Sequence, residues 1–165
     1  MEWDIDFRRG CAAHPAGAAV AAVPGMRTLL LVEDDERVAR SLVRLLTAAG
    51  CEVVHVANGD AAIAALRTRT FDLVLSDLRL PGASGIEVLT AARATDPDLP
   101  LLLMSGSPTA ATARDAEALG VVAYLAKPIL RAELRYALHL SGLVSGPIRH
   151  GLRDDAATSS ETFAE

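Results

Sequence analysis

Four separate segments of this chain carry side chains that could act together on a metal ion and a phosphoryl group. Three carboxylates stand in a row at Glu33–Asp35, a fourth stands at Asp77, and a hydroxyl and an ammonium follow at Ser105 and Lys127. Carboxylate oxygens are ligands that Mg²⁺ accepts, and an aspartate can itself act as a nucleophile and become an aspartyl phosphate. Phosphoryl transfer relies on positioning and charge neutralisation, which Mg²⁺, Lys127 and a Ser105 hydrogen bond could supply. The residue types therefore fit Mg²⁺-assisted phosphorylation of Asp77.

Each of these residues directly follows, or lies just after, a short apolar run. Thr28–Val32 is continuously apolar apart from its first residue, as expected of a strand buried on both faces. Between the apolar runs, hydrophobic residues recur at helical spacing, and glycines or prolines follow the helices. The predicted strands cover 28–32, 53–56, 73–75, 101–104 and 121–125. The predicted helices cover 38–46, 61–66, 86–94, 110–119 and 131–143, with Asn58 as a candidate N-cap of the second.

This alternation predicts an α/β fold, a (βα)5 three-layer sandwich with a parallel sheet and helices on both faces. In such sheets, sites form outside the carboxyl ends of the strands, so the four polar segments should meet at one edge. The length of 165 residues fits one domain with tails. We predict a disordered arm at 1–26, a domain at 27–144 and a flexible tail at 145–165.

Composition excludes several classes of function. The net charge of −5 argues against direct binding of nucleic acid, and no apolar segment is long enough to cross a membrane. Cys11 and Cys51 lack the spacing of a metal or disulfide motif and predict free thiols in a cytoplasmic protein. The chain has no Gly-rich dinucleotide or Walker A loop and no nucleophile elbow.

Each candidate residue, taken alone, also has an ordinary structural explanation. The acids at Glu33–Asp35 could favour a helix N-terminus, and Ser105 could satisfy backbone groups of a loop. Lys127 could be a solvated charge, and Tyr124 a half-buried core ring. Only the joint placement of the set after four strands favours a functional site.

Four stretches carry a resemblance to a known family: LLLVEDDERV, DLVLSDLRLPGASG, LPLLLMSG and AYLAKP. They resemble the receiver domain of bacterial two-component response regulators, from about Thr28 to Leu143. The resemblance implies a flavodoxin-like sheet of order 2-1-3-4-5. Leu80 stands where the family often has methionine. Arg79 and Ser107 occupy positions that tune the loss of the phosphoryl group in the family.

The resemblance also implies roles for individual residues. Asp77 would be the phosphoacceptor, assisted by Ser105 and Lys127, with Lys127-Pro128 as a pinned peptide that aims the lysine. The metal would be Mg²⁺, and the switch residues would be Ser105 and Tyr124. The implied metal ligands are Glu33, Asp34, Asp77 and the backbone carbonyl of Arg79, with Asp35 in reserve.

The function implied is that of a stand-alone receiver in phosphorelay signalling. It would take a phosphoryl group from a sensor histidine kinase or phosphotransfer protein and catalyse only its own modification. Output would pass to another protein, or through a homodimer, by the face formed by 110–119, 121–125 and 131–143. Two alternatives remain: an interaction module that is not phosphorylated, and an aspartyl phosphatase. The phosphatase would need an aspartate two places after Asp77, where Arg79 stands.

Overall fold

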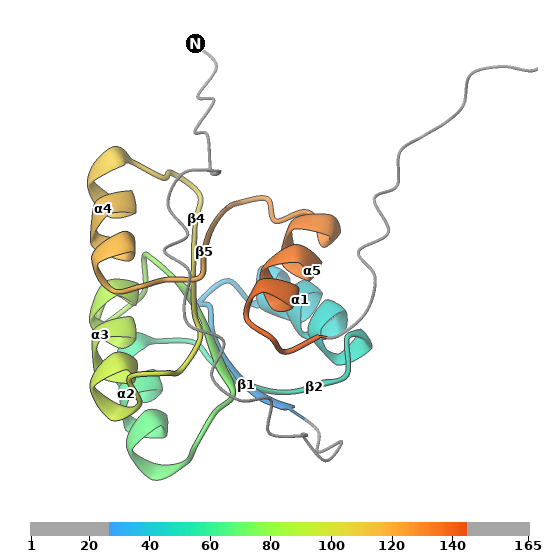
Figure 1. Cartoon of the computed structure of the whole chain (residues 1–165), viewed down its shortest axis with the longest axis horizontal. Coiled ribbons are helices and arrows are strands. Elements are labelled where there is room, and N and C mark those ends of the chain that lie inside the picture. The colour runs from blue at the N-terminus through green and yellow to red at the C-terminus, as the bar shows by residue number, and fades with distance from the viewer. Residues whose placement is uncertain (1–26, 145–165) are drawn as a thin grey trace, which may run out of the picture.

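A computed structural model describes residues 27–144, in which a parallel sheet lies between two layers of helices (Figure 1). Strands and helices alternate without exception along this part of the chain. Their bounds are β1 Arg27–Val32, α1 Glu36–Ala48, β2 Cys51–Val56, α2 Gly59–Thr68, β3 Leu73–Asp77, α3 Gly85–Thr95, β4 Leu101–Ser105, α4 Ala110–Ala118, β5 Ala123–Ala126 and α5 Arg131–Leu140. The predicted (βα)5 architecture is confirmed.

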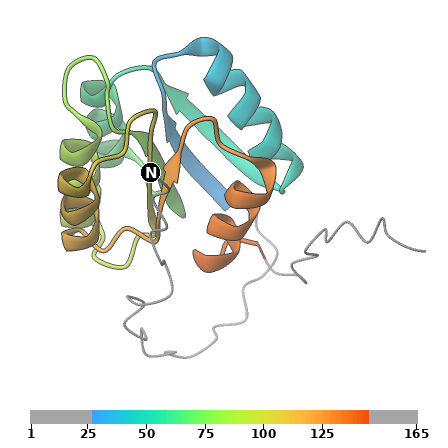
Figure 2. The ribbon, with the colours of Figure 1, turned by 90° about the horizontal axis from the view of Figure 1, so that it is seen from above.

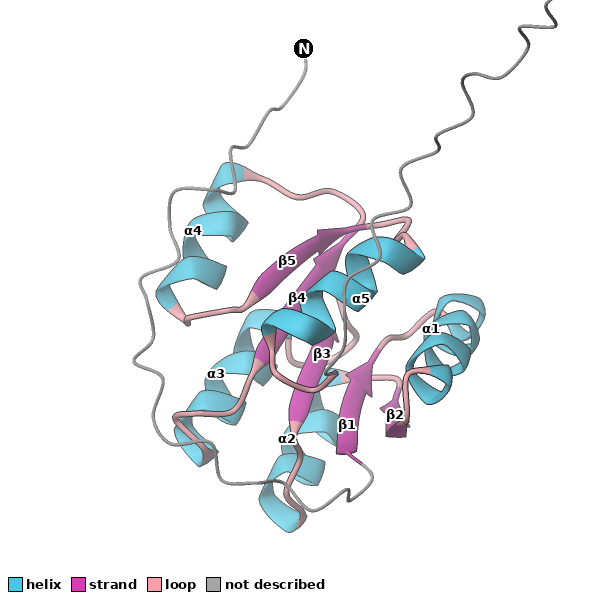
Figure 3. Ribbon diagram, turned by 45° about the vertical axis from the view of Figure 1, so that its right-hand side comes forward, coloured by secondary structure: helices cyan, strands magenta, loops and turns pink. Residues whose placement is uncertain are grey.

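The five strands are all parallel and lie in the order β2-β1-β3-β4-β5, as predicted. Figure 3 shows the strands side by side, and Figure 2 shows α1 and α5 on one face with α2, α3 and α4 on the other. The two central strands β3 and β4 are buried throughout, whereas the edge strands β2 and β5 are only partly buried. This difference explains why β3 and β4 have the more continuous apolar runs.

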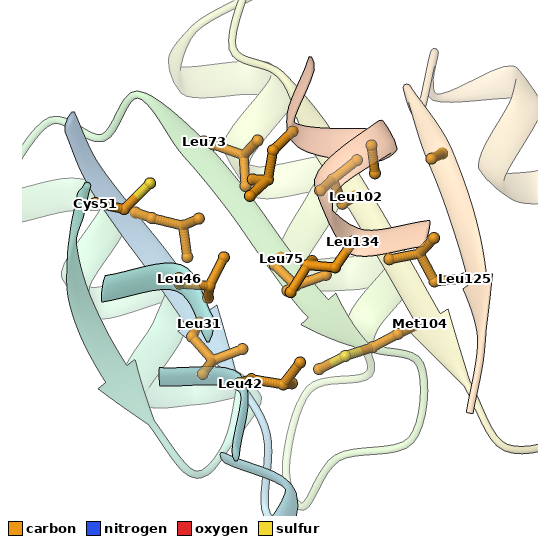
Figure 4. Packing of buried hydrophobic residues seen from close by; sticks show 14 residues of the cluster. Leu31, Leu42, Leu46, Cys51, Leu73, Leu75, Leu102, Met104, Leu125 and Leu134 are labelled. Carbon is orange, nitrogen blue, oxygen red and sulfur yellow. The ribbon is translucent and has the colours of Figure 1, made fainter. Parts of the chain in front are cut away.

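Two hydrophobic cores are formed because successive side chains of a strand point to opposite faces of the sheet. Leu31 and Leu75 face α1 and α5, where they pack with Leu46 and Leu134 (Figure 4). Leu30, Val74 and Leu103 face the other helix layer. Cys51 is buried in the first core and is a free thiol, as predicted, while Cys11 lies outside the described residues.

The end of α5 differs from the predicted end because this helix, like α4, closes with a glycine motif. After α4, Gly120 has φ +66°, and the amide of Val121 donates to the carbonyl of Ala116. After α5, Gly142 has φ +74°, and the amide of Leu143 donates to the carbonyl of Leu138. These are the paired features of a Schellman cap. Consequently β5 begins at Ala123 rather than at residue 121, and α5 ends at Leu140 rather than at residue 143.

Helix α4 is attached to the domain by few side chains. Ala116 is its one buried residue. Its C-terminal end is held by Arg93 of α3, whose guanidinium donates to the carbonyls of Leu119 and Gly120. The same guanidinium donates to the carbonyls of Pro97 and Leu99, so one side chain joins α4 to the loop between α3 and β4. We call this set of four contacts the Arg93 clasp.

The predicted arm at 1–26 and the predicted tail at 145–165 lie outside the described residues. Within 27–144, no helix has the length and hydrophobicity needed to cross a membrane.

Candidate functional site

Three carboxylates meet at the carboxyl edge of the sheet. Val32 pairs with Ser76 in the β1–β3 ladder, so the residues that follow them, Glu33 and Asp77, leave the sheet side by side. Glu33 is fully buried, Asp77 is 7% exposed, and Asp34 is exposed. One carboxylate oxygen from each of the three lies within 4.8 Å of the others. The structure thus brings together the predicted acids, although β1 and β3 are separated by 40 residues of chain.

Lys127 directly follows the edge strand β5, and its side chain reaches the same cluster of acids. Its backbone amide donates to the carbonyl of Ser105, which extends the pairing of β5 with β4. Its ammonium lies 2.6 Å from Oε2 of Glu33 and 2.5 Å from Oδ2 of Asp77. The Lys127-Pro128 peptide is cis. The ammonium therefore lies between two buried carboxylates, which is the placement predicted for a charge-neutralising lysine.

Burial and charge act in opposite directions on these groups. Burial raises the pKa of Glu33 above its ordinary value, and contacts with Lys127 offset this effect only in part. Burial also opposes the charge of Lys127, but its close contacts with Asp77 and Glu33 outweigh burial, so the pKa of the ammonium is raised. The site therefore keeps its lysine charged, while Glu33 is harder to ionise than a free glutamate.

The cluster fits a small divalent cation by a further test. Within 27–144, Oε2 of Glu33 is the one buried side-chain oxygen or nitrogen without a hydrogen-bond partner. Lys127 approaches this oxygen closely, but its direction of approach does not make a hydrogen bond. An all-oxygen donor set with one partly exposed side suits Mg²⁺, which binds few carboxylates and keeps other ligands from solvent or substrate.

Asp35 has a different role from the acids beside it. Its side chain caps α1, with Oδ1 accepting from the amides of Arg37 and Val38. These hydrogen bonds lower the pKa of Asp35. For this residue the structure supports the ordinary explanation of an acid at a helix N-terminus, and we leave Asp35 out of the ligand set that we propose.

The loop after Asp77 is tightly fitted around that residue. The amide of Arg79 donates to Oδ1 of Asp77 at 3.3 Å, so the backbone of this loop turns back over the carboxylate. Gly85, the first residue of α3, lies so close that an added Cβ would be 2.0 Å from the carbonyl oxygen of Asp77. Gly85 is not among the residues predicted for the site. A glycine at the start of a helix does not by itself indicate close packing, because the first position of a helix accepts many residue types.

Neither of the two predicted switch residues makes a hydrogen bond with the side chain of Asp77. Ser105 is 1% exposed, and its hydroxyl oxygen accepts from the amide of Ser107. Tyr124 is half-buried, and its hydroxyl lies 3.0 Å from Oγ1 of Thr112 in α4. Sequence reasoning missed Thr112, whose spacing from Thr109 was a detectable capping signal.

Comparisons with known proteins match the chain to one family. The family model described as "Response regulator receiver domain" matches residues 29–139. The chain is 37% identical over 103 residues to the response regulator receiver protein CpdR of Brucella abortus, covering 62% of this chain and 86% of that protein. It is 38% identical over 100 residues to the response regulator protein FleR of Pseudomonas aeruginosa, covering 61% of this chain and 21% of FleR. The chain thus spans most of CpdR but about a fifth of FleR.

Solved structures show the same fold. A CheY-like receiver domain protein from Methanospirillum hungatei has a TM-score of 0.67 at 25% identity, covering 72% of this chain and 97% of that one. The receiver domain of the sensor histidine kinase PA1611 from Pseudomonas aeruginosa has a TM-score of 0.64 at 28% identity, covering 72% of this chain and 99% of that one. That structure has a magnesium ion coordinated in its active site cleft. From the family match and the shared fold, this chain belongs to the response regulator receiver domain family, whose members are signalling modules of two-component systems.

Proposed function

We propose that this chain is a response regulator receiver that accepts a phosphoryl group on Asp77 and thereby switches a protein-interaction surface. The observation that carries the proposal is the meeting of three carboxylates and one ammonium at the carboxyl edge of the sheet. A structural ion pair would need one acid for one base. Here the acids outnumber the lysine, and a buried oxygen of Glu33 remains without a hydrogen bond.

In the proposed reaction an oxygen of Asp77 attacks the phosphorus of a phosphohistidine on a sensor kinase or phosphotransfer protein. A phosphorus–oxygen bond forms, the phosphorus–nitrogen bond breaks, and the imidazole leaves. Lys127, already in contact with Asp77, would follow the negative charge onto the phosphoryl oxygens. Ser105, whose proton is not engaged by the Ser107 amide, would donate a hydrogen bond to the same group.

Glu33, Asp34, Asp77 and the backbone carbonyl of Arg79 are the residues that would hold Mg²⁺. When bound, the ion would supply positive charge that neutralises the transferred group. The carboxylates Glu33 and Asp77 are fixed by burial at the strand ends, so they would present their oxygens with little rearrangement. Asp34 is exposed and would close the site from the solvent side.

Output would pass through the face formed by α4, β5 and α5 to a protein partner or a second copy of the chain. The new charge on Asp77 would draw in Ser105, and Tyr124 would turn toward the space that Ser105 leaves, shifting an existing balance between two states. Tyr136 and Leu140 of α5 are 50% and 44% exposed, which suits a surface that binds protein. This role implies a cytoplasmic location, without direct contact to nucleic acid.

The test is intact-mass spectrometry after incubation with acetyl phosphate, with and without Mg²⁺. We expect the wild type to gain one phosphoryl group only with Mg²⁺, and Asp77→Asn to gain none. Asp98→Asn, which changes an exposed aspartate far along the chain, is the matched control and should behave as wild type. If neither acetyl phosphate nor a panel of phosphorylated histidine kinases modifies the wild type, the interaction module without phosphorylation becomes the better explanation.

A further inference from the structure

The hydroxyl of Tyr124 is held by a residue of α4, not by the phosphorylation site. Its oxygen lies 3.0 Å from Oγ1 of Thr112, in the first turn of the helix. We propose that Thr112 is a positioning residue that ties the ring of Tyr124 to the N-terminal turn of α4, so that ring and helix end are released together. The positioning role is a property of the unphosphorylated chain, whereas its consequence for signalling rests on the proposed function.

The hydroxyl of Thr112 has hydrogen-bond capacity left for Tyr124. Oγ1 of Thr112 donates its proton to the carbonyl of Thr109 and accepts from the amide of the same residue. A hydroxyl has one proton and two lone pairs. The proton and one lone pair are thereby used, which leaves one lone pair within reach of the Tyr124 and Thr109 hydroxyls.

The same inventory explains how the bond can open without leaving the hydroxyl of Thr112 unpaired. The hydroxyl of Thr109 lies 3.1 Å from Oγ1 of Thr112 and can take the position that Tyr124 leaves. An unpaired buried group would make release costly, whereas an exchange of one hydroxyl for another does not. The hydrogen bond between Tyr124 and Thr112 can therefore break and re-form at little cost.

The first turn of α4 has few other attachments to the domain, so this one hydrogen bond has a large effect on its position. The Arg93 clasp fixes the C-terminal end of the helix, and Ala116 is its one buried residue. Residues 106–111, which include the start of α4, are all exposed. Within the described chain, the Tyr124 bond is the side-chain hydrogen bond that joins the first turn of α4 to the sheet.

Fluorine NMR of the full chain, labelled with 3-fluorotyrosine at neutral pH, tests the proposal. The chain has two tyrosines, and Tyr124→Phe assigns the Tyr124 signal by its loss, while Tyr136 on α5 serves as internal reference. We expect Thr112→Val to shift the Tyr124 signal and leave that of Tyr136 in place. Thr112→Ser, which restores the hydroxyl, should return the Tyr124 signal close to its wild-type position.

Thr109→Val is the matched control, because it removes the other capping hydroxyl but leaves Thr112 able to accept from Tyr124. It should leave the Tyr124 signal in place. An unmoved Tyr124 signal in Thr112→Val, or an equal shift in Thr109→Val, would overturn the proposal.

Hydrogen exchange gives a second measurement that needs only Tyr124→Phe, which keeps the capping residues intact. Loss of one neutral hydrogen bond should speed exchange of amides at 112–115 by about two- to tenfold, with no change in α1. Unchanged exchange there would also overturn the proposal. Both measurements use unphosphorylated protein, so a failure of acetyl phosphate to modify Asp77 would count against the proposed function and leave this result readable.

Discussion

At the scale of single residues, Lys127 is the cation that contacts the buried carboxylates of the site. Its ammonium contacts Glu33 and Asp77 at once, and these contacts raise its pKa although burial opposes its charge. The lysine therefore stays protonated at neutral pH and is present as a cation before any phosphoryl group arrives. Its position would be preorganised for the charge that develops in the phosphoryl transfer that we propose.

Replacing Lys127 by glutamine should slow the phosphorylation of Asp77 by acetyl phosphate by about 10²–10³-fold, the usual effect of removing one preorganised charge-stabilising group. The time course of intact mass at saturating Mg²⁺ measures this rate. Arg131→Gln, which removes an exposed cation at the start of α5, is the control and should leave the rate unchanged. Equal rates in Lys127→Gln and wild type would contradict the role given to the ammonium.

Much of the site could be predicted from residue types, but not which acids share a task. Three consecutive acids look alike in sequence, and only the backbone path after β1 separates them. Glu33 turns into the protein, Asp34 faces solvent beside it, and Asp35 turns toward α1. Thr112 was missed for the same kind of reason, because its contact with Tyr124 joins two elements whose separation the sequence does not give.

At the scale of elements, caps and glycines fix where helices begin around the site. Asn58 caps α2 as predicted, with its side chain accepting from the amide of Ala61. The existence of each element could be predicted from hydrophobic runs, because burial of the central strands leaves a continuous signal. The end of α5 could not, because it depends on the left-handed Gly142, after which the amide of Leu143 donates back to the carbonyl of Leu138.

The cap of α1 gives a prediction about pH. Hydrogen bonds from two backbone amides lower the pKa of Asp35 below 3.8 in the folded state. A lowered folded pKa adds stability that is present above the unfolded pKa and lost as the pH falls through the folded pKa. Wild type should therefore be more stable than Asp35→Asn at pH 7, and the difference should shrink below about pH 3.8.

Urea unfolding of both proteins at several pH values measures this difference. Asparagine keeps the capping hydrogen bonds and removes only the charge, so helix capping as such is controlled. A difference in unfolding free energy that stays constant from pH 7 to pH 3 would show that the charge of Asp35 is not involved.

Gly85 gives a prediction about the junction of β3 and α3. Gly85→Ala would place a methyl group against the carbonyl of Asp77, a backbone atom that cannot move aside easily. The expected cost is about 1–3 kcal/mol of unfolding free energy, as for other overpacked positions. Gly106→Ala is the matched control, since no atom lies within 4 Å of its added Cβ. Urea midpoints of the two variants compare them, and equal midpoints would contradict the close packing.

At the scale of the whole molecule, the sheet order is what turns distant residues into one site. Glu33 and Asp77 lie on neighbouring strands, whereas Lys127 follows β5, two strands away from β3. Parallel pairing places every strand end at the same edge, so this convergence could be predicted from the alternation of strands and helices alone. The contact of one ammonium with two carboxylates could not, because it depends on how far the lysine side chain reaches across β4.

Both hydrophobic cores and all the proposed site residues lie within 27–144. A chain of these residues should therefore unfold cooperatively, with a midpoint within a few degrees of that of the full chain, and gain one phosphoryl group as the full chain does. Differential scanning calorimetry and intact mass check the two parts. A large drop in the midpoint would mean that residues outside this range contribute to the fold.

The Arg93 clasp holds the C-terminal end of α4, so a tilt of this helix would move its first turn most. A helix of nine residues is about 14 Å long, so its first turn lies about that far from the end that Arg93 holds. A tilt of about 10° around that end carries the first turn through about 2 Å, similar to helix displacements that transmit signals at protein interfaces. A small shift of residues beside Asp77 would thus become a larger displacement at the first turn of α4.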